Sequence, residues 1–159
     1  MKIELKNFKY SDFASHETPC FEATIVIDGK RRGTVSNDGR GGSNCYHPYG
    51  IEFDIQAYAM TLPAEVCELF PEGLAQNADS LISRILDDHL LRKELKRKLK
   101  TKAIFIKDGT LMEGVTKRNS GHTVATVSDY YKAQGFEVLN LLPFESALNL
   151  YIHHARASA

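Results

Sequence analysis

A long segment with helical leucine and isoleucine spacing, running from Asn77 to about Lys100, most constrains what this chain can fold into. Asn77 can cap the free amides at its start, and Asp79 lies in the first turn. Seven apolar residues form one stripe along it, namely Leu81, Ile82, Ile85, Leu86, Leu91, Leu95 and Leu99. The segment therefore predicts one long amphipathic helix whose stripe belongs to the core.

Two pairs of extended segments are each broken by an Asp-Gly turn. Residues 20–28 and 31–37 flank Gly29, and residues 103–107 and 110–117 flank Gly109. Glycine accepts a positive φ without a Cβ clash, so Asp-Gly between such runs is typical of a tight hairpin. Residues 2–10 place apolar side chains on one side, as a half-buried strand does, and are expected to pair with the first hairpin.

Shorter helices complete the predicted fold. Residues 49–62 fit either a strand or a helix, and we favour a helix that ends before Pro63. Ser128 is expected to cap a short helix that Gly135 ends. Residues 136–142 then resemble a strand, and Pro143 opens a terminal helix with Ala147, Leu148, Tyr151 and Ile152 on one side. The expected fold is a single α+β domain over residues 1–159, with antiparallel β-hairpins packed on one long helix and two or three shorter helices.

Composition and charge say more about the compartment in which the protein is expected than about its function. The chain has 159 residues, of which 43% are apolar and 25% charged, as in soluble globular proteins. Twenty Lys and Arg balance twenty Asp and Glu, so bulk charge favours no partner. We expect a cytoplasmic protein without membrane contact, because no secretory signal or transmembrane run is present. The three cysteines form no CxxC motif and predict no disulfide framework.

A glycine-rich loop follows the first hairpin. Consecutive amides near glycines can form an anion site, and nearby arginines could surround a phosphate or nucleotide. The predicted ligand-binding residues are Arg32, Asn37, Asp38, Gly39, Arg40, Gly41 and Gly42. The loop lacks the ending of a Walker A motif and the third glycine of a dinucleotide fingerprint. The alternative is therefore a structural connection out of the hairpin.

Cys45 and His47 form the one candidate metal pair. Both residue types ligate zinc, but structural zinc sites usually combine two such pairs, and only one is visible. A surface histidine and an idle thiol are the alternative. With nearby carboxylates, His47 would also suit a small metal-dependent hydrolase acting on a phosphate-containing substrate, which is our second hypothesis for function.

The carboxyl-terminal half of the long helix is strongly basic. Its candidate nucleic-acid contacts are Arg92, Lys93, Lys96, Arg97 and Lys100. Such a patch could bind phosphates without regard to base sequence. Cations near the carboxyl end of a helix also favour its dipole, so a solvated helix face is the alternative.

The first hairpin and its glycine loop resemble segments of small uncharacterised proteins from phages, prophages and other mobile elements. The similarity covers residues 23–30 and 33–42 and extends to the basic helix and residues 103–107. It implies an accessory protein of a mobile element, for which interaction with the host or counter-defence is expected. No catalytic residue is assigned in that group, and the resemblance implies no cofactor. We therefore expect a non-enzymatic binding protein whose partner is a nucleotide, a nucleic acid or a host protein.

Overall fold

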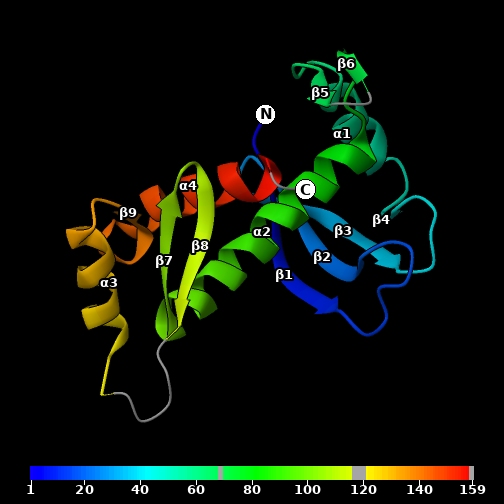
Figure 1. Ribbon diagram of the computed structural model, residues 1–159. Helices are drawn as coiled ribbons and strands as arrows, with labels where there is room; N and C mark the ends of the chain where they lie inside the picture. The colour runs from blue at the N-terminus through cyan, green and yellow to red at the C-terminus, as the bar shows by residue number, and fades with distance from the viewer. Residues whose placement is uncertain (68–69, 116–120, 158–159) are drawn as a thin grey trace. The chain divides into compact units, whose positions relative to one another are not determined.

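A computed structural model describes residues 1–67, 70–115 and 121–157 and shows an α+β protein (Figure 1). Antiparallel sheets, one long helix and three shorter helices within these residues confirm the predicted class. The chain forms two compact units, Met1–Leu86 and Asp87–Ala159, which we call the amino-terminal and carboxyl-terminal units. The prediction of a single domain stays a prediction.

A four-stranded antiparallel sheet forms most of the amino-terminal unit. Its strands are β1 (Ile3–Ser11), β2 (Cys20–Ile27), β3 (Lys30–Asp38) and β4 (Cys45–His47), paired in that order. Asp28 and Gly29 have φ angles of 49° and 78° at the β2–β3 turn. Positive φ at both positions is what a two-residue type I′ hairpin turn requires. The predicted hairpin and its pairing with the first strand are therefore confirmed.

Helix α1 (Ile51–Ala59) confirms the helical alternative for residues 49–62. It buries Ile51, Ile55 and Ala59, which recur every four residues along one face. A second hairpin follows, formed by β5 (Glu65–Cys67) and β6 (Phe70–Leu74), which was not predicted from the sequence. Pro71 lies inside β6, where its missing amide weakens the usual strand signal.

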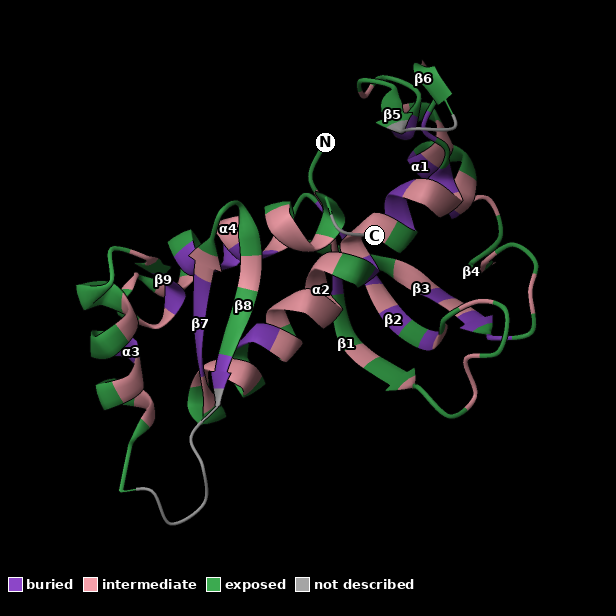
Figure 2. Cartoon of the chain, viewed as in Figure 1, coloured by how far each residue is buried: buried purple, intermediate pink, exposed green. Residues whose placement is uncertain are grey.

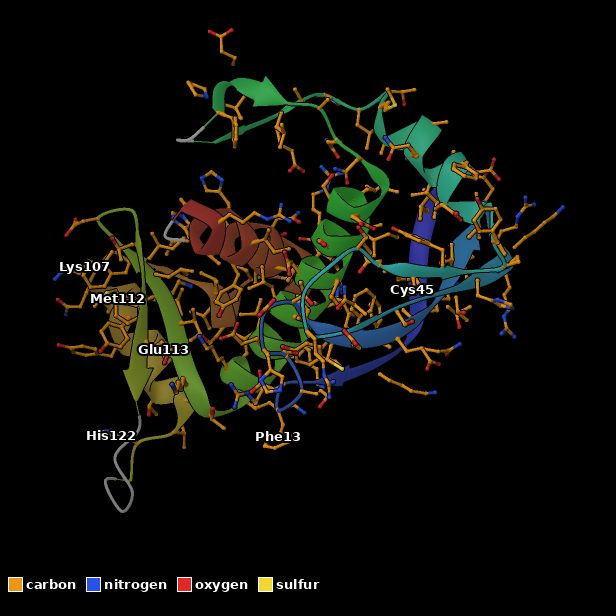
Figure 3. All side chains as sticks on the ribbon, turned by 90° about the vertical axis from the view of Figure 1, so that its right-hand side faces the viewer. Phe13, Cys45, Lys107, Met112, Glu113 and His122 are labelled. Carbon is orange, nitrogen blue, oxygen red and sulfur yellow. The ribbon has the colours of Figure 1, made fainter. Side chains whose placement is uncertain are left out.

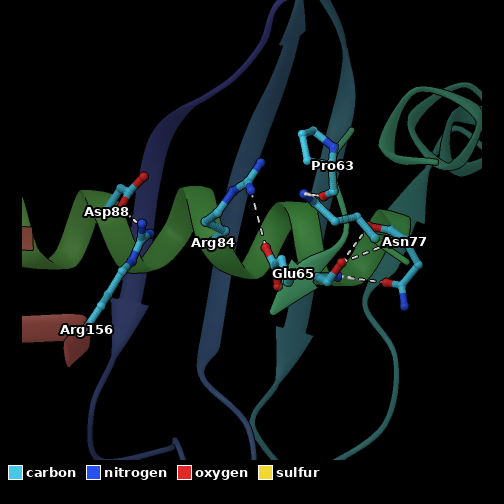
Figure 4. A network of polar contacts seen from close by, with 8 residues as sticks. Pro63, Glu65, Asn77, Arg84, Asp88 and Arg156 are labelled. Carbon is cyan, nitrogen blue, oxygen red and sulfur yellow. Dashed lines mark hydrogen bonds and ion pairs between the residues drawn. The ribbon is translucent and has the colours of Figure 1, made fainter. Parts of the chain in front are cut away.

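Helix α2 (Ala78–Thr101) confirms the predicted long helix. Asn77 caps it as expected, because its side-chain oxygen accepts a 2.8 Å hydrogen bond from the amide of Ser80 (Figure 4). Within the amino-terminal unit, Leu81, Ile82 and Leu86 are buried, and Arg84 forms a 3.3 Å ion pair with Glu65. The apolar stripe thus belongs to the core, as its spacing predicts.

The carboxyl-terminal unit has a three-stranded sheet in the order β8-β7-β9. Strands β7 (Lys102–Lys107) and β8 (Thr110–Val115) confirm the second hairpin, and β9 is Glu137–Val138. Asp108 and Gly109 repeat the positive φ values of the first turn. The middle of β7, from Ala103 to Phe105, is buried (Figure 2). Residues 116–117 of the predicted partner strand, and 119–120 of the predicted loop, lie outside the described residues.

Helix α3 (Val124–Ala133) begins earlier than predicted, and the cap assigned to Ser128 is wrong. Thr123 caps it: its hydroxyl accepts a hydrogen bond from the amide of Thr126, whose hydroxyl accepts one from the amide of Thr123. This reciprocal pair satisfies amides at the helix start better than one serine inside the helix can. Ser128 is instead buried, with 1% of its surface exposed. Gly135 follows the helix with a φ of 84°, as expected.

The strand predicted for residues 136–142 is largely wrong. Only β9 pairs with β7, and a short 3₁₀ helix, η1 (Leu139–Leu141), follows at once. The turn places Leu139 in the core and the Asn140 side chain against the end of α2. Helix α4 (Phe144–Ala157) then begins after Pro143, as predicted, and buries Ala147, Leu148 and Tyr151. These residues pack with Leu95 and Ile104 in the core of this unit.

A cluster of charges links α2 to the β7–β8 hairpin. Glu113 on β8 forms ion pairs with Lys102 and, at 2.7 Å, with Lys98. Lys98 also pairs with Glu94 and donates a 2.9 Å hydrogen bond to the Tyr151 hydroxyl. The hydrogen bond from Lys102, and to a smaller extent the one from Lys98, holds the pKa of the Glu113 carboxyl below its usual value of 4.5.

This lowered pKa predicts a pH-dependent contribution to stability. The ionised Glu113 stabilises the fold fully above about pH 4.5, and that contribution is lost as the pH falls through its lower folded-state pKa. In Glu113→Gln the free energy of unfolding, measured by urea denaturation from pH 7 to about pH 3, should therefore fall less steeply in acid. Glu137→Gln, at an exposed carboxylate without an ion pair among the described residues, is the control. Identical acid slopes for wild type and Glu113→Gln would contradict the assignment.

Candidate functional site

The glycine-rich loop is folded around one buried side chain, Asn37, which is 8% exposed. Its oxygen accepts hydrogen bonds from the Gly39 amide (2.9 Å) and the Thr18 hydroxyl (2.7 Å). Its nitrogen donates to the Gly42 carbonyl and to the Asn44 side chain, both at 3.2 Å. All four hydrogen-bonding positions of this carboxamide are used. Asn37 thus holds the loop in one conformation.

Three consecutive amides of the loop, from Gly39 to Gly41, already have acceptors. The Arg40 amide donates to the Asp38 carboxylate (3.1 Å), and the Gly41 amide donates to the Thr18 hydroxyl (3.2 Å). The Glu17 carboxylate lies against Gly41, 2.4 Å from where a Cβ would stand. An anion site needs free amides and no competing carboxylate. These contacts favour the structural alternative for the loop.

The structure does not bring all the predicted ligand-binding residues together. Asn37 and Asp38 end β3 and residues 39–42 follow in the loop, but Arg32 lies near the opposite end of β3. There it is exposed and lies 3.9 Å from Asp54 of α1. Arg40 is exposed at the loop. Arg32 and Arg40 therefore do not converge on one phosphate.

Cys45 and His47 lie on β4, opposite Ser36 and Thr34 of β3. Both are exposed, and as alternate residues of one strand they share a face of the sheet. Within residues 1–67, 70–115 and 121–157, no group of three or more His, Cys, Asp and Glu is placed to hold a metal ion. The prediction of a metal pair thus gains no further ligand from the described residues.

A groove of about 550 Å³, which we call the Tyr49 groove, lies beside β4 in the amino-terminal unit. It has an aromatic wall, formed by Tyr49 and Phe53, and a polar wall from β4 and the start of α2. Cys45, labelled in Figure 3, contributes its exposed thiol. Sequence reasoning missed this groove. In the sequence, only the four-residue spacing of Tyr49 and Phe53 indicated such a site. This spacing places the two rings on a different helix face from Ile51 and Ile55.

Asp79 organises the polar wall of the Tyr49 groove. Its carboxylate accepts hydrogen bonds from the Tyr46 hydroxyl (2.7 Å), the Asn44 amide (3.3 Å) and the Asn44 side chain (3.1 Å). Burial, and next the hydrogen bond to Asp79, raise the pKa of Tyr46. The phenol therefore stays neutral and serves as a donor. Among the described residues no cation pairs with Asp79.

Four cations form an exposed row on α2 in the carboxyl-terminal unit. All four side chains are exposed: Lys93, Lys96, Arg97 and Lys100. The last three follow Lys93 by three, four and seven residues, which places all four on one face of the helix. We call this row the basic stripe. None of the four forms an ion pair within the part of the chain that the structure describes.

The other basic residues of this segment are engaged in the fold. Arg92, a predicted nucleic-acid contact, forms two 2.7 Å hydrogen bonds with the Glu145 carboxylate. Lys98 and Lys102 belong to the Glu113 cluster. Burial, followed by the charges of Lys93, Arg92 and Lys96, lowers the pKa of His89 on the same helix. The structure thus separates four available cations from three that hold the unit together.

Zero net charge conceals a strong difference between the two units. Residues 1–86 contain eight Lys and Arg against twelve Asp and Glu, a net charge of −4. Residues 87–159 contain twelve Lys and Arg against eight Asp and Glu, a net charge of +4. The basic stripe therefore belongs to a cationic unit and the Tyr49 groove to an anionic one. Counting charge over the whole chain hides both.

Searches with this chain match no protein-family model, no curated protein and no solved structure. No helix of the described residues has both the length and the apolar character needed to cross a bilayer. What the protein does is therefore inferred from its own charges and contacts.

Proposed function

We propose that the protein is a non-enzymatic binding protein that contacts the phosphate backbone of nucleic acid through the basic stripe. The observation that carries this proposal is that Lys93, Lys96, Arg97 and Lys100 are exposed together on one face of α2. None of them forms an ion pair with a carboxylate among the described residues. The stripe extends over about 10 Å of the helix, since each residue rises about 1.5 Å.

The composition of the stripe favours a polyanion over a protein partner. Stable protein interfaces have an apolar or aromatic centre surrounded by a polar rim. The stripe consists of cations only, and the neighbouring Phe144 ring is already covered by Arg92 and Lys96 at about 5.5 and 5.3 Å. Phosphate contacts from lysine and arginine release counterions and carry no base specificity. We therefore propose binding that is sensitive to salt and indifferent to sequence.

Binding of a labelled 20-base-pair duplex, followed by fluorescence anisotropy, tests the proposal. Four contacts predict that affinity weakens about 100-fold between 50 and 200 mM salt. Lys93→Gln with Arg97→Gln should weaken binding roughly 10-fold and reduce the salt slope by about 2. The matched control is Lys30→Gln with Arg31→Gln, which removes the same charge from exposed positions of the amino-terminal unit.

Two results would overturn this function. One is the absence of binding at low salt, and the other is an equal loss of affinity in the stripe variant and in the control. The proposed setting is the cytoplasm, and the accessory role in a mobile element implied by the resemblance stays a prediction.

A further inference from the structure

The Tyr49 groove carries two aromatic rings in an unusual position. Tyr49 is 85% exposed and Phe53 is 59% exposed, although α1 buries its other apolar face in the core. The two rings lie edge to face, with centroids 5.9 Å apart. Neither ring is covered by the fold, so a ligand can pack against them. Large exposed aromatics beside a concave surface are typical of interaction sites.

The same groove is anionic. Asp79 and Glu52 line it, and none of the described residues that line it is Lys or Arg. Both carboxylates are held by neutral donors: Glu52 accepts a 2.8 Å hydrogen bond from the Gly50 amide, and Asp79 is held by Tyr46 and Asn44. Neutral donors orient a carboxylate without cancelling its charge. Two carboxylates without a lysine or arginine partner among the described residues thus lie next to exposed aromatic rings.

Two amides at the start of α2 that could otherwise bind an anion already have acceptors. The Ala78 amide donates to the Gln56 side chain at 2.8 Å, and the Ser80 amide donates to Asn77. A phosphate would meet two carboxylates instead. The negative charge of the residues that line the groove therefore favours a cationic ligand.

We infer that the Tyr49 groove binds an arginine side chain of a partner peptide, with the guanidinium on the carboxylates and its apolar stem against Tyr49 and Phe53. Guanidinium groups stack on aromatic faces and form paired hydrogen bonds with carboxylates. A volume of about 550 Å³ exceeds what one arginine side chain fills, which leaves room for flanking peptide backbone. This inference concerns the amino-terminal unit and does not depend on the basic stripe.

The test is an NMR titration of the full ¹⁵N-labelled chain with acetylated, amidated Gly-Ser-Arg-Ser-Gly. The expected result is a set of shifts confined to amides of β4, α1 and the start of α2. The same peptide with citrulline, a neutral arginine analogue, should bind at least 10-fold more weakly. The inference is overturned by equal binding of the citrulline peptide, by shifts elsewhere, or by no shifts.

Two further probes separate other occupants. If agmatine, which has the arginine side chain without a peptide, binds as tightly, the occupant is a free organic cation and the peptide assignment fails. The second probe is the same peptide with lysine in place of arginine. If it binds as tightly as the arginine peptide, the site recognises positive charge alone and the guanidinium assignment fails.

Surface variants locate the binding without disturbing the core. Phe53→Ala should weaken the arginine peptide about 10-fold, whereas Phe13→Ala, at a 94% exposed ring outside the groove (Figure 3), should leave it unchanged. Glu52→Gln can still accept the Gly50 hydrogen bond but removes one charge. It should weaken the arginine peptide and not the citrulline peptide. Equal effects of Phe53→Ala and Phe13→Ala would contradict the assignment.

Discussion

Gly39→Ala is expected to destabilise the amino-terminal unit by about 3 kcal/mol or more. Gly39 has a φ of 83°, a left-handed conformation that costs an alanine about 1–2 kcal/mol. A Cβ there would also lie 2.1 Å from the carbonyl oxygen of Ala14 and 2.9 Å from Cβ of Cys20. Since the nearest atom is backbone, relief requires movement of the main chain, and overpacking of this kind costs about 1–3 kcal/mol.

The position of Gly39 explains why this movement is costly. Its amide donates to Asn37, and its carbonyl accepts hydrogen bonds from the amides of His16 (2.9 Å), Glu17 (3.0 Å) and Thr18 (3.4 Å). Displacing the Gly39 backbone therefore disturbs the glycine-rich loop and the β1–β2 connection together.

Gly42→Ala is the matched control, because Gly42 has a φ of 89° but no atom within 4 Å of the added Cβ. Gly42→Ala should therefore lose only the conformational contribution, about 1–2 kcal/mol. Urea unfolding of both variants gives the difference in unfolding free energy. Equal losses of unfolding free energy in the two variants would contradict the predicted steric clash between the added Cβ and the Ala14 carbonyl oxygen.

Asn140→Ala is expected to destabilise the carboxyl-terminal unit by about 3 kcal/mol. The Asn140 side-chain oxygen accepts a 2.7 Å hydrogen bond from the amide of Ile104. Its nitrogen donates to the carbonyls of Leu99 (3.2 Å), in the last turn of α2, and of Lys102 (2.9 Å), the first residue of β7. One side chain thus joins η1, α2 and β7. Removing it leaves the amide of buried Ile104 without an acceptor, and a buried unpaired donor costs about 1–3 kcal/mol by itself.

Asn149→Ala is the control for this prediction, since Asn149 is exposed on α4 and its side chain forms no hydrogen bond within the described residues. Its unfolding free energy in urea should stay within about 0.5 kcal/mol of the wild type. Amide hydrogen exchange adds a local test, because Asn140→Ala should accelerate exchange at Ile104. Unchanged exchange there would contradict the role assigned to Asn140.

The sequence predicted elements that local chemistry specifies. Asp28-Gly29 and Asp108-Gly109 both form the expected turns, because the positive φ they adopt depends on two adjacent residues alone. Asn77 and the leucine spacing likewise predicted α2. The errors at Ser128 and residues 136–142 arose where several local patterns competed. A threonine pair capped α3 earlier, and Asn140 found partners in α2 and β7.

For the candidate sites too, the sequence indicated some features and only the contacts in the structure explained others. The basic segment was visible in the sequence, but only the structure separates Lys93, Lys96, Arg97 and Lys100 from the cations that Glu145 and Glu113 engage. Those carboxylates come from α4 and β8, which sequence spacing does not bring near α2. The glycine-rich loop shows the converse, since its composition suggested a ligand site and its contacts with Asn37 and Thr18 explain it structurally.

By itself the sequence determined the α+β class, the two tight hairpins, the long helix and the position of its positive charges. These follow from backbone preferences and periodicities that extend over a few neighbouring residues. Only the tertiary structure decided which cations remain available, which amides of the loop are already used, and that Tyr49, Phe53 and Asp79 border one groove. Such facts depend on contacts between segments far apart in the chain, and short-range patterns carry no information about them.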